Sequence, residues 1–304
     1  MYKITPTDRK NIKLADKAFK LGDRATALNY YLKAAENGNA DAMVDCGRIY
    51  FEGIFGVEQN IDKALEWFHK AGELGNSTAL NNIGYIYSTM EKHEEALIWY
   101  EKAANLGDVV SMLNISNSYR RDFNNKTKAR EWLKKAESLP DTYSIRKVAD
   151  YYFQEDVIKT HIDRAISLYH KAIKMGDNQA YKDLGDLYFQ LDEYENARHT
   201  YQKGASVGNV DCMVNFGMIL SCAPDCFEPA KYWLSKAVNK GDTFAMKMLG
   251  DLYEGYGEYA KALRWFRKAA SAGEREAVEY LPKIKKLLKR HKPDYKLKVR
   301  SISD

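Results

Sequence analysis

Four cysteines and six histidines are the side chains of this 304-residue chain best suited to bind a transition metal. Cys222 and Cys226 lie close together, separated by Ala-Pro-Asp. A structural zinc site needs four converging ligands, and no second Cys or His pair accompanies these two. The cysteines therefore predict no zinc site. Four of them in a chain of this length also do not indicate a disulfide-based scaffold.

Motifs of catalytic and nucleotide-binding sites are also incomplete. His93-Glu94-Glu95 lacks the second histidine of the HExxH zinc-protease motif. Gly255-Tyr-Gly257 lacks the third glycine of GxGxxG, and no phosphate-binding GxxxxGKS/T or nucleophile motif GxSxG occurs. The six histidines do not recur at a fixed spacing along the chain. We therefore predict a protein that is not an enzyme and uses no cofactor and no metal.

Charge is concentrated at the C-terminal end. Residues 283–304 carry nine Lys or Arg and two Asp, a net charge of +7. Because the whole chain has a net charge of +5, the other 282 residues have a net charge of −2. A body this close to neutral creates no long-range field to attract phosphates, so nucleic acid is disfavoured as a partner. No run of about 18 apolar residues indicates a membrane span. The first six residues lack the apolar core of a secretory signal, so a cytoplasmic location is expected.

A short motif, Lys-Ala-x-x-x-Gly, returns along the chain and reveals an internal repeat. We call its last residue the anchor and count positions from it. The anchors are Gly38, Gly75, Gly107, Pro140, Gly176, Gly208, Gly241 and Gly273. They are 32 to 37 residues apart. This spacing predicts about eight structural units of similar size.

Several residue types keep fixed places relative to the anchor. Position −11 is always Ala, position −8 holds all five tryptophans, and position −7 is Tyr, Phe or Leu. Position +9 is Gly, Ser or Ala, and position +12 is usually Tyr. Positions −11, −8, −7 and −4 form one face of an α-helix, and +5, +8, +9 and +12 form one face of another. Each unit is therefore predicted to be a pair of helices that buries its apolar faces by stacking on its neighbours.

The segment Tyr50-Phe-Glu-Gly-Ile-Phe-Gly-Val57 and the following Asp62-Lys-Ala-Leu-Glu-Trp-Phe-His-Lys-Ala71 carry the sharpest family signature. They resemble the Sel1-like repeat pattern YxxGxGVxxDxxKAxxWFxKA, with one extra residue in each of two gaps. Sel1-like repeats are relatives of the tetratricopeptide repeats. The resemblance covers residues from about 10 to 282. It implies an α-solenoid that serves as an adaptor in protein complexes, and it implies no catalytic residues.

The same resemblance bears on the cysteines. Cysteine-rich members of the family place half of a disulfide at the position of Cys212, but Val238 occupies the position of its partner. We therefore expect Cys46 and Cys212 to be small core residues.

The predicted fold is all-α, a right-handed α/α superhelical solenoid of about eight helix-turn-helix repeats over 1–282, followed by a basic C-terminal capping helix and tail over 283–304. The step from position +9 to the next −11 alanine is 17 residues after Gly47 and 16 after Ala149, against 12 or 13 elsewhere. We expect residues 52–61 and 154–162 to protrude on one edge as a second possible binding surface. Pro282 is expected to kink or end the last helix.

Binding residues are expected at positions +6, +10 and +13, which share a helix face away from the core. In related repeats this face lines a concave groove. The candidates are Arg48, Phe51, Asn81, Tyr85, Asn117, Arg120, Arg146, Asp150, Phe153, Lys182, Asp186, Phe189 and Met218. Leu113 shares the face. The alternative is a solvated face with i,i+4 ion pairs such as Arg146–Asp150, Lys182–Asp186 and Lys247–Asp251, each worth about 0.2–0.5 kcal/mol. Exposed aromatic residues beside Arg and Asn favour a binding surface.

The basic segment Lys283–Lys292 has apolar residues at 284, 287 and 288 and therefore predicts an amphipathic helix. One interpretation is a cap in which Ile284, Leu287 and Leu288 cover the last unit. The other is contact with an anionic membrane or nucleic acid. No interleaved aromatic residues support base stacking.

Together these features favour a scaffold or adaptor that binds a protein or peptide in the groove. The alternative is a dedicated inhibitor, such as an immunity protein that wraps a bacterial toxin.

Overall fold

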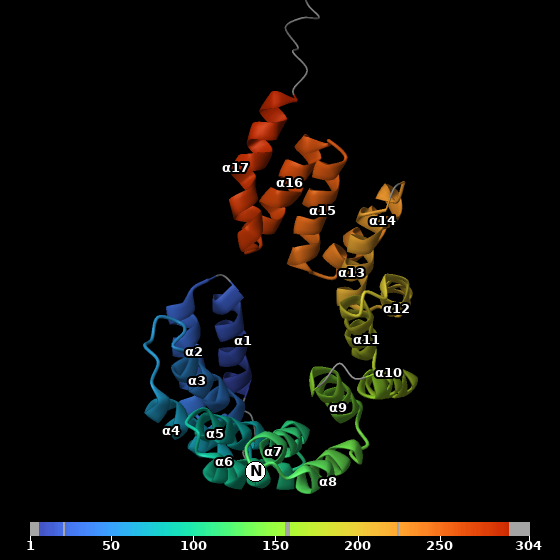
Figure 1. Ribbon diagram of the computed structural model, residues 1–304. Coiled ribbons are helices and arrows are strands. Elements are labelled where there is room, and N and C mark those ends of the chain that lie inside the picture. Colours follow the sequence, from blue (N-terminus) through green and yellow to red (C-terminus); the bar gives the residue numbers. More distant parts are fainter. Residues whose placement is uncertain (1–5, 21, 156–158, 224, 292–304) are drawn as a thin grey trace, which may run out of the picture. The chain divides into compact units, whose positions relative to one another are not determined.

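The computed structural model describes residues 6–20, 22–155, 159–223 and 225–291, and in that part of the chain every regular element is an α-helix (Figure 1). The helices are α1 (Pro6–Lys20), α2 (Arg24–Glu36), α3 (Ala40–Glu52), α4 (Ile61–Glu73), α5 (Ser77–Thr89), α6 (His93–Asn105), α7 (Val109–Arg121), α8 (Lys126–Glu137), α9 (Thr142–Glu155), α10 (Lys159–Lys174), α11 (Gln179–Gln190), α12 (Tyr194–Ser206), α13 (Val210–Ser221), α14 (Phe227–Asn239), α15 (Thr243–Gly255), α16 (Tyr259–Ser271) and α17 (Arg275–Arg290). The chain divides into two compact units, Met1–Ala172 and Ile173–Asp304, which we call unit 1 and unit 2.

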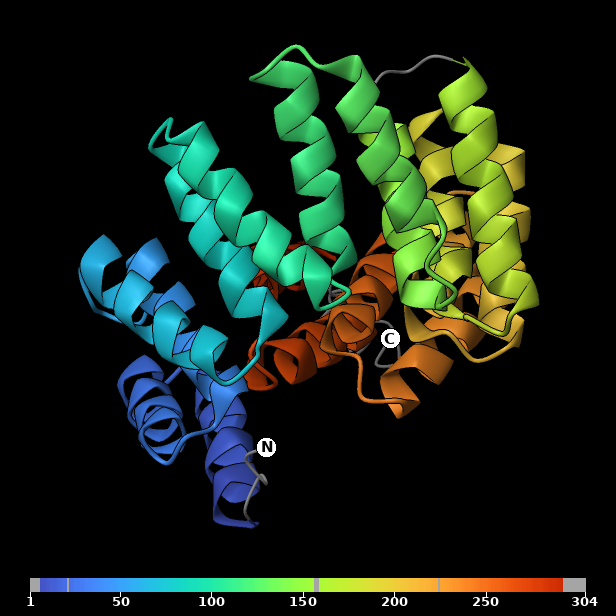
Figure 2. The ribbon, with the colours of Figure 1, turned by 90° about the horizontal axis from the view of Figure 1, so that it is seen from below.

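Within each unit, consecutive helices pack in pairs, and the pairs stack on one another. In unit 1, α3 packs on α4, α5 on α6 and α7 on α8, and the second helix of each pair also contacts the first helix of the next. Figure 2 shows these pairs side by side, in blue to green. In unit 2 the first helices α11, α13, α15 and α17 contact one another in series and form one layer. The predicted all-α solenoid of helix pairs is therefore confirmed in each unit.

Each helix pair is joined to the next by the anchor turn that the sequence repeats. Gly38 has φ 90° and Gly208 has φ 100°, left-handed values that cost glycine no steric strain. The residue after the anchor then starts the next helix. The Asn39 side chain accepts a hydrogen bond from Ala42 N at 2.8 Å, and Asp242 accepts one from Ala245 N at 2.6 Å. These N-caps satisfy a backbone N–H group that the helix itself leaves unpaired.

The small residue nine positions after one anchor and the large residue seven positions before the next anchor fit together. A Cβ placed on Gly47 would lie 2.5 Å from the Phe68 ring, and one on Gly84 would lie 2.6 Å from the Tyr100 ring. Any larger residue at these glycines would have to push a buried ring aside. The fixed spacing of the repeat therefore encodes close contact between the two helices of a pair.

The tryptophans at −8 are half-buried between successive pairs. Trp67 and Trp99 pack against the core of unit 1, and Trp233 and Trp265 against the core of unit 2. The His69 ring of α4 meets Trp99 of the next pair edge-on, with ring centroids 4.9 Å apart. The lysine of the Lys-Ala motif lies over the outer ring face, as Lys102 does over Trp99 at 3.7 Å. Such cation–π contacts at exposed sites contribute about 0.5–1 kcal/mol each.

Both long connections are predicted to protrude, and the described residues contradict this at Phe55. In the segment 52–61, Phe55 turns inward and is buried, stacked on Phe19 at 5.2 Å and edge-on to Tyr31 at 6.4 Å. The prediction that the whole of 52–61 protrudes is therefore wrong at Phe55, because an apolar ring gains more by covering the core than by facing water. In the segment 154–162, the ends belong to α9 and α10, so part of the extra length extends a helix. Residues 156–158 lie outside the described part.

The last helix runs through Pro282 without ending. It continues to Arg290, so of the two predicted effects of Pro282, a kink or an end, the end does not occur. Ile284 is fully buried, and Leu287 and Leu288 pack against the same cluster around Phe266. The basic residues in the second half of α17 are exposed, namely Lys283, Lys285, Lys286, Lys289 and Arg290. The tail beyond His291 lies outside the described residues.

Two of the four cysteines are sealed in the core. Cys46 and Cys212 are fully buried, which confirms their expected role as core residues, whereas Cys222 is exposed and Cys226 is partly exposed. Burial raises the pKa of both core thiols to about 12. Thiols react as thiolates, so the core pair should be protected twice over, by inaccessibility and by protonation.

We expect a disulfide-exchange reagent at pH 8 to modify two thiols per folded chain quickly, Cys222 and Cys226, and the other two only after unfolding. The raised pKa of Cys46 and Cys212 also means that the folded state keeps protons that the unfolded state loses above about pH 9, so stability should fall as the pH rises past that value. Counting the chromophore that the reagent releases, with and without urea, measures the number of reactive thiols in the folded and unfolded chain. Four rapidly reacting thiols in the native protein would contradict the buried positions.

Candidate partner-binding surface

The first helices of unit 1 carry an aromatic contact that crosses from one repeat to the next. Phe51 on α3 meets Tyr85 on α5 edge-on, with ring centroids 5.9 Å apart. Tyr85 is 50% exposed although it is a large aromatic residue. Arg48, one turn before Phe51, is also exposed and lies 3.9 Å from both Asp45 and Glu52. This end of the surface combines an accessible ring with an adjacent cation, the composition typical of binding hot spots.

Polar side chains continue the same surface across α5 and α7. The Asn81 side-chain oxygen accepts hydrogen bonds from Ser111 Oγ and Asn114 Nδ2, each at 2.9 Å. Farther along α7, Arg120 donates to the Asn117 side-chain oxygen at 3.2 Å. Asn81 therefore serves mainly to hold α5 against α7. Its oxygen has little capacity left for a partner because it already accepts two bonds.

At α9 the candidate residues are partly withdrawn into the structure. Arg146 and Phe153 are half-buried. Asp150 is held from two sides, by Lys147 Nζ at 2.9 Å and by the Tyr169 hydroxyl, which donates to it at 2.5 Å. The carboxylate of Asp150 thus orders α9 against α10 rather than standing open for a ligand.

In unit 2 the candidate residues line a pocket of about 240 Å³ between α11 and α13. Phe189 (49% exposed) and Met218 (36% exposed) form part of its wall, with Ile219 beside them. Asp186 and Tyr201 line its polar side. The pocket therefore offers two accessible apolar side chains next to a carboxylate.

Asp186 is fixed by three hydrogen-bond donors. The Tyr201 hydroxyl donates to Oδ1 at 2.7 Å, Asn215 Nδ2 to the same oxygen at 3.4 Å, and Lys182 Nζ pairs with Oδ2 at 2.7 Å. The hydrogen bond to Asp186 raises the pKa of Lys182. Burial and the same carboxylate raise the pKa of Tyr201. These groups keep their ordinary charge states at neutral pH, so the pocket presents a fixed hydrogen-bonded network rather than a general acid or base.

The predicted i,i+4 ion pairs Lys182–Asp186 and Lys247–Asp251 are present, the second at 3.4 Å. Leu113, which shares the predicted face, is buried and cannot contact a partner. Val44 and Val214, at the same position +6, are buried as well, whereas the polar residues at +6, such as Asn81 and Lys182, stay partly exposed.

Sequence reasoning missed Tyr201, Asn215 and Ile219, which complete the unit 2 pocket. Tyr201 occupies position −7, which the repeat pattern assigns to the core. Its ring does pack under Gly185, but its hydroxyl emerges on the binding side. The sequence signal that could have revealed this role is the hydroxyl group of Tyr201 at a position that is Phe or Leu in several other repeats.

Among the described residues, no three His, Cys, Asp or Glu side chains come together as metal ligands.

Models of two repeat families match the chain in successive segments. The Sel1 repeat matches residues 15–39, 40–76, 120–141, 224–242 and 243–274. Tetratricopeptide repeat models match 77–106 and 159–206. The chain belongs to the Sel1-like repeat proteins. In this Sel1-like protein the two kinds of match alternate along one solenoid pattern, consistent with the shared helix-pair frame.

Curated relatives match short segments of this Sel1-like protein. The ERAD-associated E3 ubiquitin-protein ligase component HRD3A of Arabidopsis thaliana is 39% identical over 54 residues, which is 18% of this chain and 8% of that protein. Chitin synthase regulatory factor 1 of Schizosaccharomyces pombe is 35% identical over 68 residues, 22% of this chain and 15% of that protein. The matches thus span at most 15% of these relatives' length.

Among solved structures, yeast Tom70 resembles the chain with a TM-score of 0.59 at 15% identity, covering 99% of this chain and 69% of that one. The likeness shows a common fold. No described helix of the Sel1-like protein is long and apolar enough to cross a membrane.

Proposed function

We propose that this Sel1-like repeat protein is a non-catalytic scaffold that binds a protein or peptide on the exposed face of its first helices. The observation that carries the proposal is the set of accessible apolar side chains on that face. Tyr85 contacts Phe51 in unit 1, and Phe189 and Met218 line one pocket in unit 2. Proteins of this repeat family act as interaction scaffolds, and the described residues include no metal-ligand cluster.

The physical basis is desolvation of exposed apolar surface. Each large aromatic side chain that moves from water into a contact contributes about 1.5–3 kcal/mol, and a few such residues supply most of an interface's affinity. The polar network around Asp186 is already satisfied, so a partner need not supply bonds to it. The network can still fix the orientation of a bound partner through the remaining lone pairs of its oxygen atoms, at little desolvation cost.

We also propose that the partner is a protein rather than nucleic acid or a membrane, and that binding takes place in the cytoplasm. The near-neutral charge of residues 1–282 supports the first statement.

A triple variant, Tyr85→Ala with Phe189→Ala and Met218→Ala, tests the proposal. Immobilised protein should capture at least about tenfold less of its partner from native lysate than the parent does, because three exposed hot-spot side chains are removed. The matched control is Ile98→Ala with Tyr232→Ala, which removes apolar residues that are at least as exposed from second helices. Both variants should keep the parent's helical circular dichroism.

Equal capture by the parent and the triple variant, with loss only in the control, would move the binding surface to the second helices. If the captured protein is an enzyme whose activity is blocked at a one-to-one ratio, the scaffold role is replaced by that of a dedicated inhibitor.

A further inference from the structure

A second pocket, of about 210 Å³, lies within unit 1 among α7, α8, α9 and α10. It opens in the repeat where Ser116 stands at position +9 and Leu133 at position −7. The five repeats with glycine at +9 each place a large −7 side chain in the space beside that glycine. The pocket therefore coincides with a local departure from the repeat pattern.

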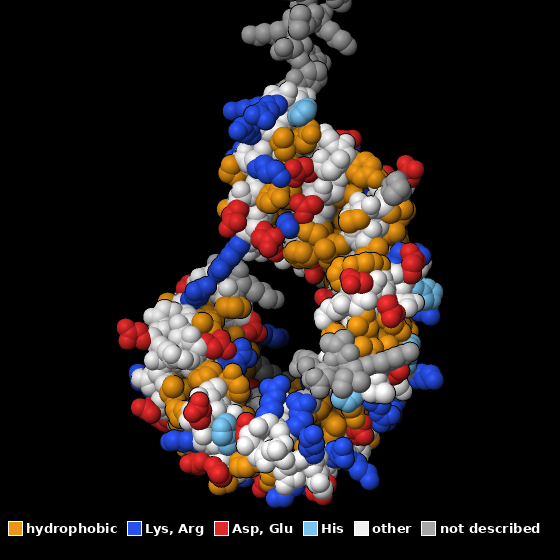
Figure 3. Space-filling model, viewed as in Figure 1, with side chains coloured by type: hydrophobic (Ala, Val, Ile, Leu, Met, Phe, Trp, Pro, Cys, Tyr) orange, Lys and Arg blue, Asp and Glu red, His pale blue; other side chains and the backbone are white. Residues whose placement is uncertain are grey.

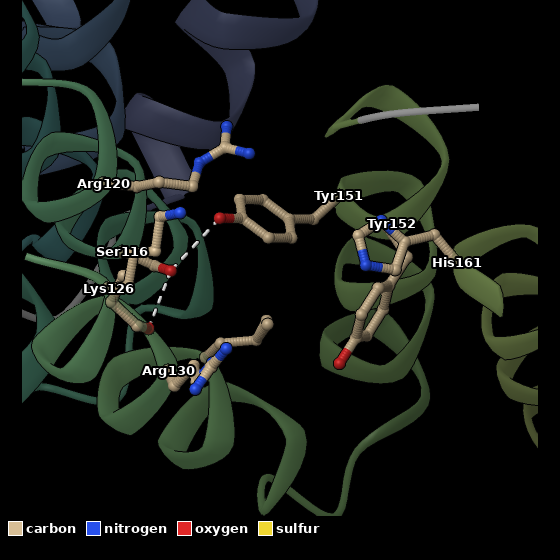
Figure 4. Close-up of a pocket in the computed structure, with 9 residues that line it drawn as sticks. Ser116, Arg120, Lys126, Arg130, Tyr151, Tyr152 and His161 are labelled. Carbon is tan, nitrogen blue, oxygen red and sulfur yellow. Dashed lines mark hydrogen bonds between the residues drawn. The ribbon is translucent and has the colours of Figure 1, made fainter. Parts of the chain in front are cut away.

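Comparison with the repeat of Gly217 explains why the space stays open. There the −7 residue is also leucine, and Leu234 packs so closely under Gly217 that an added Cβ would lie 2.8 Å from it. Leu234 is buried, whereas Leu133 remains partly exposed. Ser116 has a side chain where Gly217 has none. Its hydroxyl donates to the Ala129 carbonyl oxygen at 2.8 Å and pairs with the Tyr151 hydroxyl at 3.1 Å (Figure 4).

The pocket is bordered by positive charge. Arg120 of α7 and Lys126 and Arg130 of α8 line it, and none of the described lining residues is Asp or Glu. Figure 3 shows Lys and Arg side chains gathered over the region of α7 and α8. Figure 4 shows Arg120 and Arg130 on opposite sides of the space, with Tyr152 and His161 on a third side. Three cations with no lining carboxylate favour a ligand of more than one negative charge.

His161 supplies an open hydrogen-bonding position. Its Nδ1 atom is buried and has no hydrogen-bond partner among the described residues. A buried polar atom without a partner destabilises the folded chain, so a hydrogen bond from a bound ligand at this atom would be favourable. The His161 ring stands edge-on to Tyr152, with ring centroids 5.5 Å apart. Together with Leu133 these rings form an apolar wall beside the charged side.

We propose that this pocket binds an aryl phosphate, with the phosphate between Arg130 and Lys126 and the aromatic ring against Tyr152 and Leu133. A phosphate monoester carries about −1.5 to −2 charge at neutral pH and three acceptor oxygens. The flat guanidinium of Arg130 can donate two parallel hydrogen bonds to such a group. An aromatic ring suits the apolar wall, where it can pack edge-on against tyrosine.

Titration calorimetry on the full-length chain tests this with phenyl phosphate as the probe and phenol and inorganic phosphate as the two halves of it. We expect saturable binding of phenyl phosphate and at least about tenfold weaker binding of either half. Arg130→Ala should weaken phenyl phosphate binding about tenfold or more, because a charge-assisted hydrogen bond is lost. Lys135→Ala on the same helix is the matched control and should bind as the parent does, because Lys135 lies over Trp132 instead.

A second variant closes the pocket without relying on loss of charge. Ser116→Gly with Leu133→Tyr recreates the Gly84–Tyr100 pair of the neighbouring repeat, so it should fold and lose binding. A phosphotyrosyl peptide in parallel distinguishes the source of the group. Tighter binding than phenyl phosphate would assign the aryl phosphate to a partner chain, and weaker binding to a small molecule.

Absence of saturable phenyl phosphate binding, or unchanged affinity in both Arg130→Ala and the closed-pocket variant, would overturn the assignment. Phenol binding as tightly as phenyl phosphate would do so as well, because it would show that the charge plays no part. These results are independent of partner capture, since Tyr85, Phe189 and Met218 do not line this pocket.

Discussion

Replacing Phe68 by alanine should lower the free energy of unfolding by about 3–5 kcal/mol, the usual cost of removing a fully buried phenylalanine side chain. Phe68 is 1% exposed and lies directly under Gly47, which has no side chain to fill the space left behind. The cavity would lie between α3 and α4, whose packing is the basic contact of the repeat. Urea unfolding followed by far-ultraviolet circular dichroism measures the change.

Tyr85→Ala is the matched control in the same unit. Tyr85 is half exposed and loses little more than its contact with Phe51, so its substitution should cost about 1 kcal/mol or less. Similar destabilisation by the two variants would mean that the −7 ring is not a main support of the stack. A stable Tyr85→Ala variant also ensures that any loss of partner binding reflects the surface rather than unfolding.

Ile284→Ala should destabilise the protein by about 2–5 kcal/mol, the range for a buried isoleucine. Ile284 is fully buried on α17 and belongs to the cluster that includes Phe266 and Ala277. In this position α17 covers the apolar face of the α15–α16 pair. Thermal unfolding monitored by circular dichroism would show a lowered midpoint.

Lys285→Ala changes the neighbouring exposed residue and should leave the midpoint almost unchanged. Equal midpoints for the parent and Ile284→Ala would contradict capping by this segment. A lowered midpoint for Ile284→Ala alone would support our proposal that the basic segment 283–304 caps the 1–282 solenoid, with its basic side exposed to solvent.

The helix pairs and their register could be predicted from the sequence because one set of contacts recurs in most repeats. The anchor turn needs a left-handed residue, and Gly38 and Gly208 supply it. The helix after it needs an N-cap, which Asn39 supplies. The contact between Gly84 and Tyr100 likewise repeats at fixed spacing. Repetition turns weak local preferences into a strong pattern.

Features that occur once were harder to predict. Phe55 lies in an insertion, where no periodicity shows whether a side chain faces the core or water. The pocket beside Ser116 results from two departures in one repeat, and their consequence depends on how far Leu133 can approach. Both outcomes are decided by packing between neighbouring helices, which local sequence does not specify.

The candidate surface was predictable in part. Helical periodicity places Tyr85, Phe189 and Met218 on an exposed face, and they are exposed. The same periodicity cannot show that Asp150 is engaged by Tyr169, because the two residues lie on different helices. It also cannot distinguish an exposed +6 position from one covered by the next pair, as at Leu113.

Site-specific photo-crosslinking tests the binding face most directly. A photoreactive phenylalanine analogue would replace Tyr85 or Phe189 on the first helices, and Ile98 or Tyr232 on the second helices, all four positions being similarly exposed. We predict partner-dependent crosslinks in native lysate from Tyr85 and Phe189 and none from the other two positions. Crosslinks only from Ile98 and Tyr232 would contradict binding on the first helices.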